Sequence, residues 1–121
     1  GVSFSYPKPE LLVRYLISIA NDPDGIYLDF FAGSGTTAHA VTRLNAQDGR
    51  NRKFILISST EATAEDPNKN VCRDVCAKRV RQVQGGYTDT KGEEVSGLGG
   101  SFAYLRARRI PKHRLALKLA H

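Results

Sequence analysis

The chain has 121 residues, with 18 Lys and Arg against 12 Asp and Glu, and 40% of its residues are hydrophobic. This length predicts one small domain, residues 1–121, and the composition is that of a globular protein, which excludes disordered and membrane-embedded classes. No apolar run approaches the ~20 residues of a membrane-spanning helix, and no secretory signal is visible, so we expect a cytoplasmic protein with no membrane partner. Because the first residue is Gly1 and not Met, we expect the chain to begin inside a longer gene.

The excess positive charge lies in a basic tail, residues 106–121. Acids and bases cancel through Glu94, and no acid follows that residue. The six cations of the tail are Arg106, Arg108, Arg109, Lys112, Arg114 and Lys118. Such a segment attracts polyanions, nucleic acid first, and Arg106, Arg108 and Arg109 are the DNA-binding candidates. A solvated helix face is the alternative for the same residues.

The first half of the chain alternates helical and strand patterns. Residues 10–20 predict an amphipathic helix, and a Pro and Gly turn ends it near residue 25. The apolar face of this helix comprises Leu11, Leu12, Tyr15, Leu16 and Ile19. Residues 26–31 and 54–57 are short apolar runs, typical of strands buried on both faces in a parallel sheet. Between them, residues 38–47 predict a helix in which Ala38, Val41 and Leu44 recur at the helical period.

The second half continues with a helix over residues 71–83. Its inward positions are Val71, Cys72, Val75, Cys76, Val80 and Val83, and its largely outward positions are Arg73, Lys78, Arg79 and Arg81. We interpret the two cysteines as small buried apolar residues, because two thiols are too few for a structural zinc site, and we predict no metal site. Residues 85–100 are glycine-rich and predict a loop or hairpin; a third strand at 102–105 and a last helix at 110–119 follow.

This order of elements predicts an α/β protein with a mostly parallel sheet and flanking helices. Three strands with their helices make about half of a doubly wound domain. We therefore expect one side of the sheet to need a partner.

The most informative segment is LDFFAGSGTT, residues 28–37. A buried strand that ends near Asp29 and runs through a Gly-X-Gly turn into a helix is typical of a nucleotide-type ligand site. Gly33 and Gly35 permit positive φ and let a ligand approach the backbone. The alternative is a tight turn without a ligand, but the flanking strand, the acid and the helix-start residues Thr36 and Thr37 favour a ligand.

The kind of ligand follows from what the turn lacks. No Lys follows it as in a P-loop, and Ala38 occupies the third glycine position of the dinucleotide fingerprint. Both absences disfavour a phosphate-bearing ligand. A cofactor without phosphate, such as S-adenosylmethionine, fits better.

Two segments together resemble a known family. FSYPKPELL, followed by IYLDFFAGSGTTAHAVTRLNAQDGRNRKFILI, is similar to adenine-specific DNA methyltransferases of the type III restriction-modification Mod subunit kind. RKFILI through VCRDVCAKRVRQV and on to GLGGSFAYLRARRI also resembles this group. The resemblance implies a partial Rossmann-like methyltransferase fold, S-adenosylmethionine as cofactor and double-stranded DNA as partner, with a restriction subunit as a further partner.

The resemblance also assigns cofactor-binding residues. The wall beside the methionine part of the cofactor would comprise Phe4, Lys8 and Pro9. The cofactor loop would comprise Asp29, Phe31, Gly33, Ser34, Gly35 and Thr36, with Thr37 beginning the helix. Glu61 is the acid closest after the second strand, so it is a candidate for the ribose hydroxyls, against the alternative of a solvated loop residue. His39, on the helix after the turn, we interpret as structural or solvated.

One family motif is absent. The family transfers the methyl group at an Asp-Pro-Pro-Tyr type motif, whose aromatic ring stacks on a base swung out of the helix, and no such motif occurs in this chain. We therefore predict no catalytic residue here, and we expect the remainder of the same methyltransferase to supply the catalytic and target-recognition parts. Two alternatives are a non-catalytic nucleic-acid-binding module with the same fold and a methyltransferase acting on a small molecule or protein.

Overall fold

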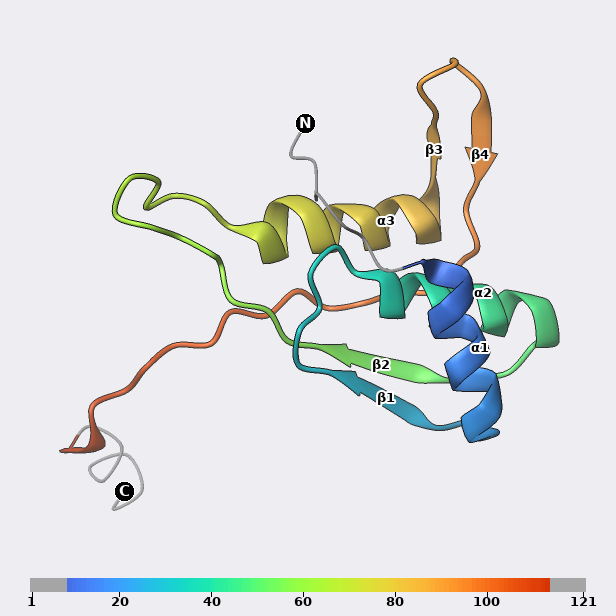
Figure 1. The fold of residues 1–121 in the computed structure, drawn as a ribbon, viewed down its shortest axis with the longest axis horizontal. Coiled ribbons are helices and arrows are strands. Elements are labelled where there is room, and N and C mark those ends of the chain that lie inside the picture. The colour runs from blue at the N-terminus through green and yellow to red at the C-terminus, as the bar shows by residue number, and fades with distance from the viewer. Residues whose placement is uncertain (1–8, 114–121) are drawn as a thin grey trace.

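The computed structural model describes residues 9–113. Its elements follow one another along the chain as shown in Figure 1. They are α1 (Glu10–Ala20), β1 (Ile26–Asp29), α2 (Thr36–Asp48), β2 (Lys53–Leu56), the π-helical η1 (Cys72–Ala77), α3 (Lys78–Gly85), β3 (Gly86–Thr88) and β4 (Glu94–Ser96). Together with the parallel pairing of β1 and β2, this order confirms the prediction of a small α/β protein with a parallel sheet.

Strands β1 and β2 pair in parallel, with Tyr27 opposite Phe54. These two aromatic side chains lie on the same face of the sheet, toward residues of α1 and α2. There they pack against a small apolar core of buried residues, which comprises Ile17, Ala40, Val41 and Leu44. The helical period predicted for α2 is confirmed, because Ala38, Val41 and Leu44 are all buried.

The face of α1 that contacts the core differs from the predicted apolar face. Ile17 is buried and Val13 packs against the core, whereas all five residues of the predicted face are more than half exposed: Leu11, Leu12, Tyr15, Leu16 and Ile19. The apolar stripe exists in the sequence, but α1 lies on α2 through the opposite side. Periodicity identifies an apolar face without saying which neighbour covers it.

The prediction that β1 and β2 are buried on both faces is wrong for the part of the chain that the structure describes. Ile26 and Leu28 of β1 and Ile55 of β2 are 50–63% exposed. Side chains alternate along a strand, so these residues share the face opposite Tyr27 and Phe54. Among residues 9–113, nothing covers this side of the sheet, and the expectation that the sheet needs a partner stays a prediction.

The predicted helix over 71–83 forms as two joined pieces, η1 and α3. Its inward positions Val71, Cys76, Val80 and Val83 are buried, and Cys72 and Val75 are half-buried. The glycine-rich region forms the antiparallel hairpin β3–β4, which projects away from the helices (Figure 1).

The predicted strand at 102–105 does not form. Instead, Phe102 and Tyr104 of this segment contact residues on the helical side. The Asn70 side-chain amide donates to the Tyr104 hydroxyl at 3.4 Å, and the Arg81 guanidinium lies 5.5 Å from the centre of the Phe102 ring. These contacts hold the segment against η1 and α3 without backbone pairing to β2. Most of the predicted last helix, 110–119, lies outside the described residues.

The packing of α1 leads to a direct test. Replacing Ile17 by Ala should lower the free energy of unfolding by about 2–4 kcal/mol, because it opens a cavity between α1 and α2. Leu16→Ala, one residue earlier and 55% exposed, should cost less than about 0.5 kcal/mol. Urea unfolding of the 121-residue chain measures both values. A larger loss for Leu16→Ala would mean that the predicted apolar face is the packed one.

Candidate functional site

The glycine turn joins the end of β1 to the start of α2, next to the end of β2. The Ile57 amide donates to the Asp29 carbonyl at 2.8 Å, and the Ala32 amide donates to the Ile57 carbonyl at 3.1 Å. Parallel pairing thus extends past both strands and anchors the turn at their carboxyl ends. This is the edge at which open α/β sheets bind ligands.

The Asp29 carboxylate braces the glycine turn by hydrogen bonds to both of its ends. Its Oδ1 accepts a hydrogen bond from the Phe31 amide at 2.9 Å, and its Oδ2 accepts one from the Thr37 hydroxyl at 2.7 Å. One carboxylate therefore ties the end of β1 to the first turn of α2. Hydrogen bonds to a charged acceptor are the stronger kind, so this brace sets the path of the intervening backbone.

Both glycines of the turn have positive φ, +52° at Gly33 and +84° at Gly35. A Cβ atom at Gly35 would lie 3.2 Å from the Cys76 sulfur and 3.3 Å from the Cys76 carbonyl oxygen. Gly35 is therefore required by its backbone conformation and by close packing on η1. Burial raises the pKa of the Cys76 thiol to about 11, so this cysteine is an inert packing residue, as predicted.

Arg79 contacts the turn, which the sequence did not indicate. Its Nη1 donates to the Ser34 hydroxyl at 2.9 Å and to the Thr36 hydroxyl at 3.0 Å, and both acceptors are buried. The prediction that Arg79 points largely outward is wrong. It lies three residues after Cys76, so both side chains fall on the helical face that covers the turn.

His39 lies between two guanidinium groups. Its Nδ1 is 3.1 Å from Nη2 of Arg79, and its Nε2 is 3.2 Å from Nη2 of Arg43. A neutral imidazole accepts at one nitrogen only, so one of these contacts is a hydrogen bond and the other a close approach. Burial and then the Arg79 charge lower the pKa of His39 below its ordinary value of 6.5, with smaller lowering by Arg43 and Arg14 and an opposing effect of Glu10. The expectation that His39 is structural agrees with these contacts.

The first turn of α2 presents backbone donors at the glycine turn. Gly35 is the N-cap, the helix has no side-chain cap, and no acid lies in its first turn. An uncapped helix N-terminus favours a negatively charged group such as a carboxylate. Phe31, 86% exposed, lies two residues after the end of β1 and offers an aromatic surface beside the turn. These features fit a ligand that carries a carboxylate and an aromatic ring system.

The remaining candidates are spread over the chain. Phe4 and Lys8 lie outside the described residues, and Pro9 is exposed at the start of α1. The helix begins at Thr36, one residue before the predicted Thr37. Glu61 is exposed, has a positive φ of 55° and pairs with Lys69 at 3.4 Å. In the tail, Arg106, Arg108 and Arg109 are all exposed.

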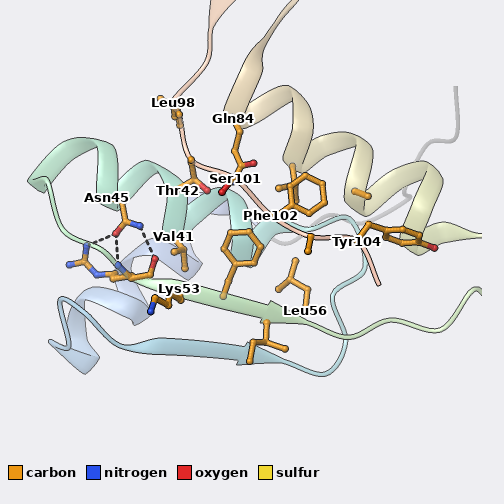
Figure 2. Close-up of a pocket in the computed structure, with 18 of the residues that line it drawn as sticks. Val41, Thr42, Asn45, Lys53, Leu56, Gln84, Leu98, Ser101, Phe102 and Tyr104 are labelled. Atoms are coloured by element: carbon orange, nitrogen blue, oxygen red, sulfur yellow. Dashed lines mark hydrogen bonds between the residues drawn. The ribbon is translucent and has the colours of Figure 1, made fainter. Parts of the chain in front are cut away.

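A cavity of about 820 Å³ lies between α2, β2, α3 and the segment after β4. Figure 2 shows its lining, with Val41 and Leu56 on one side and Phe102 and Tyr104 on the other. At one end, Asn45 bonds the backbone of Arg52 in both directions, at 2.9 and 3.0 Å, which anchors the start of β2 to α2 (Figure 2). No residue of the glycine turn lines this cavity. It marks the space left because residues 102–105 do not pair with β2.

No helix within residues 9–113 is long and apolar enough to cross a membrane. Nor does this part of the chain bring together three or more His, Cys, Asp or Glu side chains as metal ligands.

The fold is that of an α/β protein, and its braced glycine turn lies at the carboxyl ends of parallel strands, where open α/β sheets bind ligands. The family model described as DNA methylase matches residues 2–69, more than half of the chain. The chain therefore belongs to the DNA methylase family, and the resemblance noted in the sequence is confirmed.

Curated relatives agree with this assignment. The Mod subunit of the type III restriction-modification enzyme StyLTI from Salmonella typhimurium is 44% identical over 85 residues, 66% of this chain and 13% of the relative. The EcoPI Mod subunit from Escherichia phage P1 is 46% identical over 85 residues, with the same coverage. The type II methyltransferase M.KpnI from Klebsiella pneumoniae is 37% identical over 100 residues, 76% of this chain and 23% of the relative. The chain thus matches less than a quarter of each of these relatives and carries a methyltransferase portion.

The environment of His39 predicts a pH dependence. Because its pKa is lower in the folded state than in the unfolded chain, the unfolded state binds the proton first as the pH falls. Stability should therefore decrease as the pH falls below about 6.5, until the folded-state pKa is passed. His39→Gln should reduce this loss of stability, measured by thermal unfolding between pH 8 and 5. His113→Gln, in the exposed tail, is the control and should leave it unchanged.

Proposed function

We propose that this chain is the S-adenosylmethionine-binding portion of a site-specific DNA methyltransferase that acts on the amino group of adenine. The observation that carries this proposal is the glycine turn, which Asp29 braces at the uncapped N-terminus of α2 in a chain of the DNA methylase family. When bound, S-adenosylmethionine would supply a methyl group activated by its sulfonium. The residues of this chain would bind and orient that donor.

Several residues of the turn are suited to specific parts of the cofactor. The backbone donors of Gly33 and the first turn of α2 suit the methionine carboxylate, while the Gly35 amide already donates to the Ala32 carbonyl at 2.8 Å. Asp29 places a negative charge close by, which suits the amino group and the sulfonium. Phe31 suits the adenine ring, by stacking. The other proposed cofactor residues are Phe4, Lys8, Pro9, Ser34, Thr36, Thr37 and Glu61.

The remainder of a longer methyltransferase would complete the fold and the chemistry. Its catalytic motif would hold the target base, since no Asp-Pro-Pro-Tyr type motif occurs in this chain. We propose that it also covers the exposed sheet face of Ile26, Leu28 and Ile55. Parallel sheets are ordinarily covered on both faces, so this would complete a Rossmann-like domain.

Double-stranded DNA is the proposed substrate, and a restriction subunit is the further proposed partner because two of the relatives are Mod subunits of restriction-modification enzymes. We propose a cytoplasmic location, because the proposed substrate is DNA. The alternative of a non-catalytic nucleic-acid-binding module is not favoured, because a relative matching 76% of the chain is a methyltransferase.

Calorimetry with S-adenosylmethionine tests the cofactor site in the full-length protein. Asp29→Asn keeps an acceptor for the Phe31 amide and a polar partner for Thr37 while removing the charge. It should weaken cofactor binding at least about tenfold, which corresponds to about 1.4 kcal/mol. Asp24→Asn, in the exposed turn before β1, should bind like the wild type. Absence of heat with the wild-type protein would overturn the proposed function.

Salt titration tests the proposed role of the basic tail. Each phosphate contact contributes about 0.9 to the slope of log affinity against log salt concentration. If Arg106, Arg108 and Arg109 each neutralise one phosphate, changing all three to Gln should reduce that slope by roughly 2.7 in DNA-binding measurements on the full-length protein. An unchanged slope and affinity would remove the tail from the DNA interface.

A further inference from the structure

Arg79 connects a helix late in the chain to both hydroxyls of the glycine turn. A single nitrogen, Nη1, lies 2.9 Å from the Ser34 hydroxyl and 3.0 Å from the Thr36 hydroxyl. These two oxygens are themselves 3.2 Å apart and flank Gly35. Arg79 therefore holds both sides of the glycine that turns the chain into α2.

The same helical face covers the underside of this turn. Cys76 packs against Gly35, and Arg79 is three residues further along. The turn is thus held by Asp29 from the strand side and by Arg79 from the helix side.

The Arg79 side chain is half-buried, and withdrawing part of a charge from water costs free energy. Ser34 is 7% and Thr36 4% exposed, and no salt bridge within residues 9–113 includes Arg79. Burial accordingly lowers the pKa of Arg79 below its ordinary value. Neutral hydroxyls and an imidazole offset little of the cost of a buried charge. An apolar side chain at position 79 would pack α3 on α2 at a lower cost in free energy. The presence of an arginine there is therefore better explained by its charge and by the several hydrogen bonds that its guanidinium can donate.

We propose that Arg79 is a positioning residue for the cofactor: it holds Ser34, Gly35 and Thr36 in the conformation that binds S-adenosylmethionine. This inference rests on the proposed function. Arg79 contacts the turn and not the reacting atoms, so it should govern cofactor affinity and leave the rate at saturating cofactor unchanged.

The test compares two substitutions on α3 in the full-length protein. Arg79→Lys keeps the charge but lacks the planar fork that reaches the two hydroxyls and His39 together. We expect its dissociation constant and KM for S-adenosylmethionine to rise about tenfold, with kcat and DNA affinity close to wild type. Arg81→Lys is the matched control, because Arg81 lies two residues later and its guanidinium faces the Phe102 ring. It should bind the cofactor like the wild type.

A second variant separates positioning from folding. Ser34→Ala removes one acceptor and leaves Arg79 in place, so we expect about a threefold weaker cofactor affinity. In the double variant with Arg79→Lys and Ser34→Ala, the two losses of cofactor affinity should not add, because both substitutions break the same contact. Thermal unfolding of each variant shows the folded fraction at the temperature of calorimetry.

The outcomes are distinct. Wild-type cofactor affinity in folded Arg79→Lys, or an equal loss in Arg81→Lys, would overturn the positioning role and leave the proposed function intact. If Arg79→Lys folds, additive losses in the double variant would also overturn it; if Arg79→Lys does not fold, wild-type affinity in folded Ser34→Ala would overturn it. No cofactor binding by the wild-type protein would overturn the proposed function itself, on which this role depends.

Discussion

The geometry of the site depends on the Asp29 carboxylate. It accepts one hydrogen bond from the Phe31 amide and one from the Thr37 hydroxyl, and so fixes how the chain leaves β1 and enters α2. The parallel pairing of β1 with β2 continues through Asp29, Ala32 and Ile57 and holds the same point from the backbone. A turn with two positive φ angles keeps one shape only when its surroundings determine it, and here they do.

Charge is arranged unevenly around this turn. Asp29 lies on the strand side, whereas Arg43 and Arg79 approach His39 from α2 and α3. Glu10, from α1, pairs with Arg14 and Arg43 at 3.5 and 3.6 Å. The first helix, the turn and the α3 helix are therefore coupled through polar contacts, although the apolar core between them is small.

The uncovered surfaces follow from the small number of helices and strands in this chain. A chain that matches less than a quarter of each curated relative described above has too few elements to cover both faces of its sheet. Ile26, Leu28 and Ile55 lie on the open face of the sheet, and Leu12 and Leu16 on the outer side of α1. Apolar patches of this kind mark surfaces where further protein packs.

The sequence by itself determined the family, the order of the main helices and the two parallel strands, and the turn around Gly33 and Gly35. These features depend on local patterns: apolar period, turn residues and a strand that runs into a glycine turn. Tertiary structure decided which face of α1 is buried, that residues 102–105 stay unpaired, and that Arg79 points inward. Each of these depends on a neighbour distant in the chain, such as the Ser34 hydroxyl 45 residues before Arg79. Helical periodicity assigned Arg79 to solvent because a charged side chain is ordinarily exposed, whereas the Ser34 and Thr36 hydroxyls that accept from it lie far earlier in the chain.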